Sequence, residues 1–167
     1  PQGNVGDKGQ KGVVGKGNII TWLEDGSGTA NISDDNLTVD NGTQGGTGWS
    51  FQVYSQETYT DGCYLQWVTP DATGQFLVGI DSGTQPDIGY DEEFCIIFGS
   101  TGWATIYEDG LNPESSFEYD ADDRFEITYD NDNVRYYHNG TLLRTVDVLS
   151  GIEFCTSMNW HTNWDDI

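Results

Sequence analysis

The chain has 167 residues, a net charge of −22 at pH 7 and an isoelectric point near 4.1, and 13% of its residues are aromatic. A chain this acidic repels the phosphates of nucleic acids and the headgroups of anionic membranes, which argues against either as a partner. No apolar run is long enough to cross a bilayer, so the sequence also argues against membrane insertion.

Glycine stands at every third position of the first fifteen residues, at Gly3, Gly6, Gly9, Gly12 and Gly15. In a collagen triple helix three polyproline-type chains share one axis, and only glycine fits there. The period breaks at Gly17, which follows Gly15 by two residues. We therefore expect residues 1–17 to be the end of a collagen-like stalk in a homotrimer, with a flexible glycine-rich leader as the alternative. Because the chain opens inside the repeat, without a methionine or a signal peptide, we expect it to be a piece of a longer protein.

Charge is divided unevenly between this stalk and the rest of the chain. Lys8, Lys11 and Lys16 against Asp7 give residues 1–17 a charge of +2, which leaves 3 basic and 27 acidic residues, or −24, for the remaining 150 residues. One domain of ordinary size accounts for that length. Three such heads side by side need salt, protonation or bound cations such as calcium to relieve their repulsion.

Three cysteines, Cys63, Cys95 and Cys155, each lie within an apolar or aromatic stretch. An odd number without short spacings fits neither a disulfide framework nor a zinc site. We expect three buried free thiols, with a Cys95–Cys155 disulfide as the alternative. Free thiols suit a protein that is assembled in a reducing cytoplasm.

Residues 18–48 are rich in turn-forming residues. The apolar segment Asn18–Leu23 predicts either a first strand or a neck where three chains meet. From Asn31 to Gly48 aspartate, asparagine, glycine and threonine predominate, which predicts loops with one or two weak strands.

From Trp49 onward apolar and polar residues alternate, the pattern of half-buried strands. The period of two places Trp49, Phe51 and Val53 on one face of the first strand. The strands predicted in this part of the chain are Trp49–Ser55, Cys63–Val68, Gln75–Ile80, Glu93–Phe98, Trp103–Glu108 and Ser115–Tyr119.

A three-stranded meander between Arg124 and Val148 is the strongest local prediction. Asn139-Gly140 favours a type I′ turn, in which both central residues have positive φ. Glu153–Trp160 is the last predicted strand, and no segment has a sustained helical period. The meander strands are Phe125–Tyr129, Val134–His138 and Thr141–Val146.

About nine or ten strands at regular spacing predict an all-β fold, a two-sheet antiparallel sandwich. The chain then divides into a stalk end (1–17), a neck with a loop-rich entry (18–48) and a β-sandwich head (49–167).

The segment from Asp123 through Gly140 resembles the closing meander of concanavalin-like jelly rolls, a group that includes laminin-G, SPRY and lectin or glucanase domains. In those families a strand that ends in tyrosine or phenylalanine before Asn-Gly is common, and here Tyr136 and Tyr137 shortly precede Asn139-Gly140. The resemblance implies a concanavalin-like jelly-roll sandwich, and it speaks to the fold and not to a ligand.

A collagen-like stalk followed by a small acidic β-sandwich is also similar to the distal part of bacteriophage tail fibres, including those of marine phages. Pro1 is the only proline in the Gly-X-Y triplets, which fits a bacterial or viral stalk without prolyl hydroxylation. The resemblance implies a homotrimer in the virion that is assembled in the host cytoplasm and then touches the host surface from outside.

Glucanases of the concanavalin-like fold carry alternating carboxylates on their catalytic strand, and Glu118, Asp120 and Asp122 have that spacing. The last position of the glucanase pattern wants glutamate, whereas this chain has Asp123. The acidic run also falls where the meander needs its entry turn. We therefore expect no enzymatic activity.

Asp120, Asp122 and Asp123 are also weak candidates for calcium, a hard cation that prefers six to eight oxygen ligands. No acidic loop matches an EF-hand, and solvated turn carboxylates are the alternative; we expect no other cofactor. His138 and His161 are the only histidines and are too few for a zinc site. We expect His138 to be a surface residue at the end of a strand.

Aromatic residues beside polar ones are candidate glycan sites, because tryptophan and tyrosine stack on sugar rings while aspartate and asparagine bind hydroxyls. The C-terminal tail supplies Trp160, His161 and Trp164, and the segment before an Asp-Gly turn supplies Trp103 and Tyr107. The alternative for Trp160 and Trp164 is packing in the core or against a neighbouring protomer.

Together these features predict a homotrimeric, non-enzymatic phage tail-fibre segment that attaches to a host surface polysaccharide or receptor and joins other fibre proteins. Two alternatives remain open. One is a head that only trimerises and caps the fibre, and the other is a secreted lectin-like or glucanase-like module.

Overall fold

The computed structural model describes residues 20–26, 28–34, 38–44, 48–69, 72, 74–83, 86, 87 and 89–162. The predicted stalk, with Gly3, Gly6, Gly9, Gly12 and Gly15, lies outside these residues, and so does Trp164. Every strand pairing in the described part of the chain is antiparallel.

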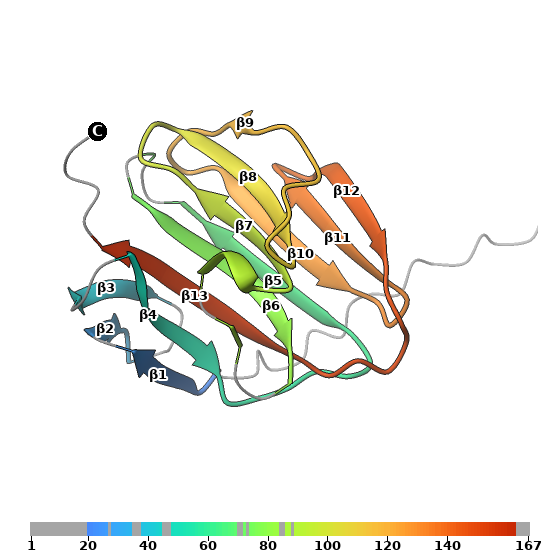
Figure 1. Cartoon of the computed structure of the whole chain (residues 1–167), viewed down its shortest axis with the longest axis horizontal. Helices are drawn as coiled ribbons and strands as arrows, with labels where there is room; N and C mark the ends of the chain where they lie inside the picture. The colour runs from blue at the N-terminus through green and yellow to red at the C-terminus, as the bar shows by residue number, and fades with distance from the viewer. Residues whose placement is uncertain are drawn as a thin grey trace, which may run out of the picture.

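The larger sheet has seven strands in the order β1-β4-β13-β6-β7-β8-β9 (Figure 1). The C-terminal strand β13 lies in the middle of this sheet, between two strands from the first half of the chain. Central position explains why β13 is mostly buried. The seven strands are β1 (Trp22–Gly26), β4 (Gly48–Ser55), β6 (Phe76–Ser82), β7 (Phe94–Phe98), β8 (Trp103–Glu108), β9 (Phe117–Glu118) and β13 (Phe154–Thr162).

The second sheet has four strands in the order β12-β11-β10-β5, so it contains the predicted meander with β5 added at one edge. Asn139 and Gly140 have φ angles of 49° and 77°, which confirms the positive φ expected at both central residues of a type I′ turn. The strands are β5 (Cys63–Val68), β10 (Arg124–Tyr129), β11 (Asn133–His138) and β12 (Thr141–Asp147).

Residues 18–48 supply three strands. The segment predicted as a first strand or a neck contains the start of β1, which pairs with β4 at the edge of the seven-stranded sheet. β2 (Gly28–Ile32) and β3 (Val39–Gln44) form a separate two-stranded sheet. In the described residues the one helical element is the short 3-10 turn η1 (Gly89–Asp91), and no helix is long and apolar enough to span a membrane.

Two apolar clusters fill the sandwich. The main core lies between the two larger sheets and takes alternate residues from their strands, such as Ile80, Ile96, Phe98 and Phe125. A smaller cluster of Phe51, Val53 and Trp160 packs against residues of β1, β2 and β3. The predicted all-β, two-sheet antiparallel sandwich is therefore confirmed for the described residues.

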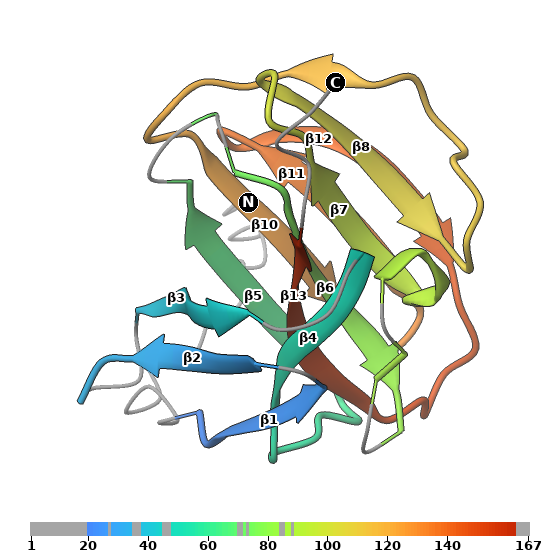
Figure 2. The ribbon, with the colours of Figure 1, turned by 60° about the vertical axis from the view of Figure 1, so that its left-hand side comes forward.

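The residues between these core positions face away from the four-stranded sheet, and we call this side of the seven-stranded sheet the outer face. It carries Ile97, Ser157 and Asn159, among others, because side chains alternate along a strand. The described residues of the loop of residues 83–93, which are 83, 86, 87 and 89–93 and include η1, lie over part of this face (Figures 1 and 2). The rest of the outer face is where a ligand can approach.

Candidate functional site

A β-bulge turns Trp49 of β4 toward the outer face. Phe51 pairs with Trp160 of β13, but the next pair is Trp49 with His161, so β4 has one extra residue at this point. An extra residue reverses the alternation of side chains, and bulges commonly re-aim a side chain in this way. The prediction that Trp49 shares a face with Phe51 and Val53 is therefore wrong: those two are fully buried in the core, whereas Trp49 lines the outer face.

Strand β8 presents three side chains to the same face. Ala104 and Ile106 are buried in the core, so the alternation leaves Trp103, Thr105 and Tyr107 on the outer side. Trp103 is 46% exposed although it is a large aromatic residue. The two glycan candidates that the sequence placed in this strand, Trp103 and Tyr107, thus lie on one surface.

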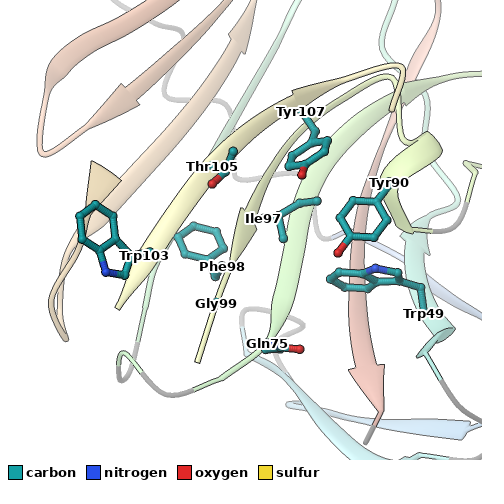
Figure 3. A pocket seen from close by; sticks show the side chains of 9 residues that line it. All are labelled: Trp49, Gln75, Tyr90, Ile97, Phe98, Gly99, Trp103, Thr105 and Tyr107. Carbon is teal, nitrogen blue, oxygen red and sulfur yellow. The ribbon is translucent and has the colours of Figure 1, made fainter. Parts of the chain in front are cut away.

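These residues surround a cavity of about 210 Å³, which we call the aromatic hollow. Figure 3 shows Trp103 at one end of it and Trp49 with Tyr90 at the other, with Ile97 and Thr105 between them. Three strands and η1 therefore bring aromatic rings to one place from distant parts of the sequence. The lining residues are Trp49, Gln75, Tyr90, Ile97, Phe98, Gly99, Trp103, Thr105 and Tyr107.

Ring contacts fix the aromatic side chains at one end of the hollow. Tyr90 lies edge-on to Trp49, with centroids 5.6 Å apart and planes at 83°, and its centroid is 5.2 Å from that of Tyr107. His161 lies edge-on to Trp49 at 5.2 Å, so it supports the wall of the hollow. Such edge contacts hold rings in defined orientations. Burial lowers the pKa of His161, which keeps the imidazole neutral at pH 7.

Polar contacts fasten the loop of residues 83–93 to the outer face. They join main-chain groups of the loop to side chains of the sheet, and they position Tyr90 over the hollow. The Asp87 N–H donates to Asp81 Oδ2 (2.7 Å), Gln52 Nε2 donates to the Pro86 carbonyl (3.2 Å), and the Gly89 N–H donates to Asn159 Oδ1 (3.2 Å).

Glu92 belongs to this loop, and its side chain is fully buried. The Ser157 hydroxyl donates to Glu92 Oε1, and Glu92 Oε2 has no hydrogen-bond partner among the described residues. Burial raises the pKa of Glu92 well above its ordinary value of 4.5, and burial also raises the pKa of neighbouring Asp81 to about 6. Neither carboxyl lines the aromatic hollow, so they belong to the loop's support.

A second cavity, of about 620 Å³, adjoins the first, and we call it the polar hollow. Trp103 lines both cavities. The polar hollow lies where the turns of residues 99–102 and 119–123 meet the end of the β11–β12 hairpin. Its lining residues are Ala72, Thr101, Gly102, Trp103, Glu118, Tyr119, Asp120, Asp123, His138 and Asn139.

Asp123 is the centre of a hydrogen-bond network in the polar hollow. Asn139 Nδ2 donates to one oxygen (2.6 Å), and His138 Nε2 (2.7 Å) and the Asp120 N–H (2.9 Å) contact the other. Burial by itself would raise the pKa of Asp123, but these bonds outweigh it and lower the pKa to about 2. His138 lies at the end of β11 as expected, yet its ring stacks on Phe125 with centroids 4.6 Å apart instead of standing free at the surface.

The acidic run of residues 120–123 forms a turn and not a strand. β9 ends at Glu118, and Asp120 to Asp123 form the entry turn of the meander, with Asp122 at φ 66°. Both oxygens of Asp123 are engaged with donors of the protein. In the part of the chain that the structure describes, no three His, Cys, Asp or Glu residues are placed to hold a metal ion.

The structure separates the residues of the predicted C-terminal glycan site from one another. Trp160 is only 7% exposed and stacks on Phe51 with centroids 5.7 Å apart, so it packs in the core, the alternative stated for it above, and a ligand cannot reach its ring. His161 contacts the hollow through Trp49. The structure therefore brings Trp103 and Tyr107 to one cavity, places His161 behind its wall at Trp49, and leaves Trp160 out of it.

All three cysteines are free thiols, as expected; Cys95 and Cys155 are buried and Cys63 is partly buried. β6 lies between the strands that carry Cys95 and Cys155. Two inter-strand steps alone separate their Cα atoms by roughly 9–10 Å, and the register adds to this because Cys95 pairs with Gly79 and Cys155 with Asp81, whereas a disulfide needs less than about 7 Å. The alternative Cys95–Cys155 bridge cannot form in this fold.

Trp49, Gln75 and Tyr90 line the site, and sequence reasoning did not select them. Tyr90 is an aromatic residue within an acidic loop, and aromatic residues on loops often serve binding, so that position carried a usable signal. Gln75 carries no such signal, and the direction of Trp49 depends on the bulge.

No protein family and no curated protein matches the sequence. Solved structures match its fold. The PSpry domain of TRIM65 has a TM-score of 0.59 at 11% identity, over 82% of this chain and 83% of its own. Carbohydrate binding module CBM66 from Bacillus subtilis has a TM-score of 0.51 at 12% identity, over 86% and 90%. The carbohydrate recognition domain of Emp47p has a TM-score of 0.51 at 12% identity, over 86% and 80%. At these identities the likeness shows the fold alone, and the jelly-roll, concanavalin-like sandwich expected from the sequence is confirmed.

Proposed function

We propose that this chain is a non-enzymatic glycan-binding protein and that the aromatic hollow is its sugar site. The observation that carries the proposal is the half-exposed Trp103 at the edge of a cavity that Trp49, Tyr90 and Tyr107 also line. An aromatic face packs against the apolar C–H face of a sugar ring, while Thr105 and Gln75 offer partners for hydroxyls. Large apolar rings with a few polar groups are typical of ligand sites.

Similar folds support a sugar ligand at a coarse level. Two of the matching structures are a carbohydrate binding module and a carbohydrate recognition domain. The fold therefore accommodates sugar binding, and the aromatic hollow supplies the local chemistry for it.

The composition of the hollow supports binding without catalysis. Among the described residues that line it there is no aspartate, glutamate, histidine, lysine or cysteine. Hydrolysis of a glycosidic bond requires a pair of carboxylic groups that flank it. The side chains of Asp81 and Glu92, which hold the neighbouring loop, are buried.

We place this glycan-binding head at the end of a homotrimeric phage tail fibre that attaches to a host surface polysaccharide. Support for this part comes from the unbroken Gly-X-Y run of residues 1–15, which precedes the head. Such a virion protein is assembled in the host cytoplasm together with other fibre proteins. In the trimer, three sites of modest affinity lie on one axis, and the second and third sites bind at a high effective concentration once the first is occupied, which raises the overall avidity. A fibre cap without a ligand is the competing function, and exposed Trp103 argues for the ligand.

A binding measurement tests the sugar site. The full chain, Trp103→Ala and Tyr64→Ala are screened against an immobilised glycan panel, and hits are measured by titration calorimetry. Tyr64 is the control because it is 60% exposed on the other sheet. We expect Trp103→Ala to weaken binding at least about tenfold and Tyr64→Ala to leave it unchanged. Wild-type affinity in Trp103→Ala, or no hit for the full chain, would overturn the proposal.

Light scattering tests the fibre. A trimeric mass is expected for the full chain and for a chain that starts at Asn18, because a short proline-poor stalk needs a trimeric head to stay in register. A monomer in both cases rejects the fibre while it leaves the sugar site to stand on its own test.

A further inference from the structure

The aromatic hollow and the polar hollow share Trp103, so its indole is a wall common to both. We propose that they are two subsites of one groove that holds an extended glycan without anionic groups, and that Trp103 lies under the middle of that glycan. This inference rests on the sugar site proposed above and names the class of glycan it takes.

Cavity size argues for a joint site. Ligand sites usually measure about 300–1,000 Å³. The aromatic hollow, at about 210 Å³, is below that range, whereas the polar hollow adds about 620 Å³ and brings the pair well inside it. A ligand that spans both therefore has the volume of an ordinary site, and a ligand confined to the first does not.

Strand register places the two subsites side by side. Trp103 pairs with Glu118 across β8 and β9, so the carboxylate-bearing residue lies on the neighbouring strand to the indole. Along the chain, Thr101 and Gly102 of the polar hollow directly precede Trp103, and Thr105 and Tyr107 of the aromatic hollow follow it on β8. A chain molecule that follows β8 over Trp103 thus passes from aromatic contacts to polar ones.

The chemistry of the two subsites is complementary. Rings dominate the aromatic hollow, while carboxylates and an amide dominate the polar hollow. Asp123 is already engaged by Asn139 and His138, which leaves Glu118 and Asp120 as the exposed carboxylates of the groove. An ionised carboxylate only accepts hydrogen bonds, so these residues select ligands that donate them, such as sugar hydroxyls or ammonium groups.

Charge excludes acidic glycans from the same groove. Among the residues that the structure describes, no lysine or arginine lines either hollow, and all three arginines of the head lie on the four-stranded sheet. Each is held in an ion pair: Arg124 with Glu126, Arg135 with Asp130, and Arg144 with Glu108 and Glu114. Uronate or sulfate groups would meet carboxylates without a compensating cation, and like charges at short range repel strongly.

Titration calorimetry with defined oligosaccharides tests the inference. The probes are β-linked glucose and N-acetylglucosamine oligomers of two and six units, a six-unit glucosamine oligomer, and a hyaluronan hexasaccharide. We expect a six-unit neutral or amine-bearing oligomer to bind at least about tenfold more tightly than its two-unit counterpart. Hyaluronan should bind at least about tenfold more weakly than the neutral hexamer at low salt, with the difference narrowing as salt screens the carboxylates.

Two variants address the polar hollow, and one serves as control. Thr101→Trp fills the polar hollow from an exposed turn and should bring the affinity ratio of six-unit to two-unit oligomers close to one. Glu118→Gln keeps the size of the side chain and removes one negative charge. It should reduce the ratio of the affinity for the neutral hexamer to the affinity for hyaluronan. Asp147→Asn makes the same charge change on the exposed edge strand β12 and should alter neither quantity.

The outcomes separate this inference from the proposed function. Equal affinity for short and long oligomers, or an unchanged ratio in Thr101→Trp, refutes the second subsite while sugar binding stands. Hyaluronan that binds as tightly as the neutral hexamer refutes the charge selection. If none of the oligomers binds the full chain and the glycan panel is also blank, the proposed function itself fails.

Discussion

Gly89 packs against Trp49 so closely that a Cβ on Gly89 would lie 2.7 Å from Trp49 Cγ. Gly89 also has φ +79°, a conformation that side chains disfavour. The loop of residues 83–93 therefore rests on the indole that the bulge has turned outward. The position of this loop and the position of the Trp49 ring depend on each other, and both shape the aromatic hollow.

Gly89→Ala is expected to lift the loop from Trp49 and to weaken sugar binding. Gly151→Ala is the matched control, since Gly151 also has φ +79° but has no atom near its added Cβ. We expect the control to lose about 1 kcal/mol in urea unfolding from φ strain alone. Gly89→Ala should lose roughly 1–3 kcal/mol more from overpacking. Equal losses for the two variants would mean that the contact with Trp49 is not a constraint.

Burial of Glu92 predicts that stability falls as pH rises. The unfolded chain releases this proton near pH 4.5, whereas the folded chain holds it to higher pH, so folding becomes less favourable above pH 4.5. Asp81 adds to the fall between pH 3.8 and about 6, because burial also raises its pKa.

Glu92→Gln should therefore be more stable than the parent at pH 8 and close to it at pH 4.5, as measured by urea unfolding. General charge repulsion also grows with pH, so Asp147→Asn is needed as a control that removes one exposed charge. If the two variants gain the same stability between pH 4.5 and pH 8, burial of Glu92 is not the cause.

The lowered pKa of Asp123 predicts a contribution to stability with the opposite dependence on pH from that of Glu92. Hydrogen bonds to its carboxylate lower the pKa from 3.8 to about 2, so its stabilising effect is complete above pH 3.8 and disappears as pH falls through 2. Allowing for solvent screening, we expect Asp123→Asn to lose about 1 kcal/mol at pH 7 and almost nothing at pH 2. A loss that persists at pH 2 would assign the effect to packing instead of charge.

Alanine variants of Trp160 and Trp103 should have different effects on stability and on sugar binding. Trp160→Ala opens a cavity in the small core beside Phe51 and is expected to cost about 3–5 kcal/mol in chemical unfolding. Trp103→Ala removes a ring that is 46% exposed and should cost much less, while it weakens sugar binding. Comparable losses of stability from the two variants would count against Trp103 as a ligand platform.

Patterns within short segments of the sequence were sufficient to predict the strands of the head. Alternation placed Trp103 and Tyr107 on one side of β8, and the turn chemistry of Asn139-Gly140 gave the hairpin between β11 and β12. Cys63–Val68 and Trp103–Glu108 have the bounds predicted for them. These features depend on residues that are close in sequence, which is why the sequence alone reveals them.

Features that depend on pairing between distant segments could not be predicted from the sequence. Trp49 departs from its predicted face because β13 pairs with β4 through a bulge, and the partner strand lies more than a hundred residues away. Tyr90 reaches the hollow only because residues 83–93 fold back over the sheet, and burial of Trp160 depends on β2 and β3. Periodicity within one segment contains no information about such partners.

The bulge on β4 decides how the binding surface responds to a change in the length of this strand. Ser50 is the additional residue between Trp49 and Phe51, and its removal restores regular alternation along the strand. Trp49 would still face outward, because it would then directly precede Phe51, and every core side chain from Phe51 onward would keep its place. Loss of the Ser50 codon thus leaves the aromatic wall intact, whereas loss of the Gln52 codon would turn Phe51 outward and Trp49 inward and could change the preferred receptor in one genetic step.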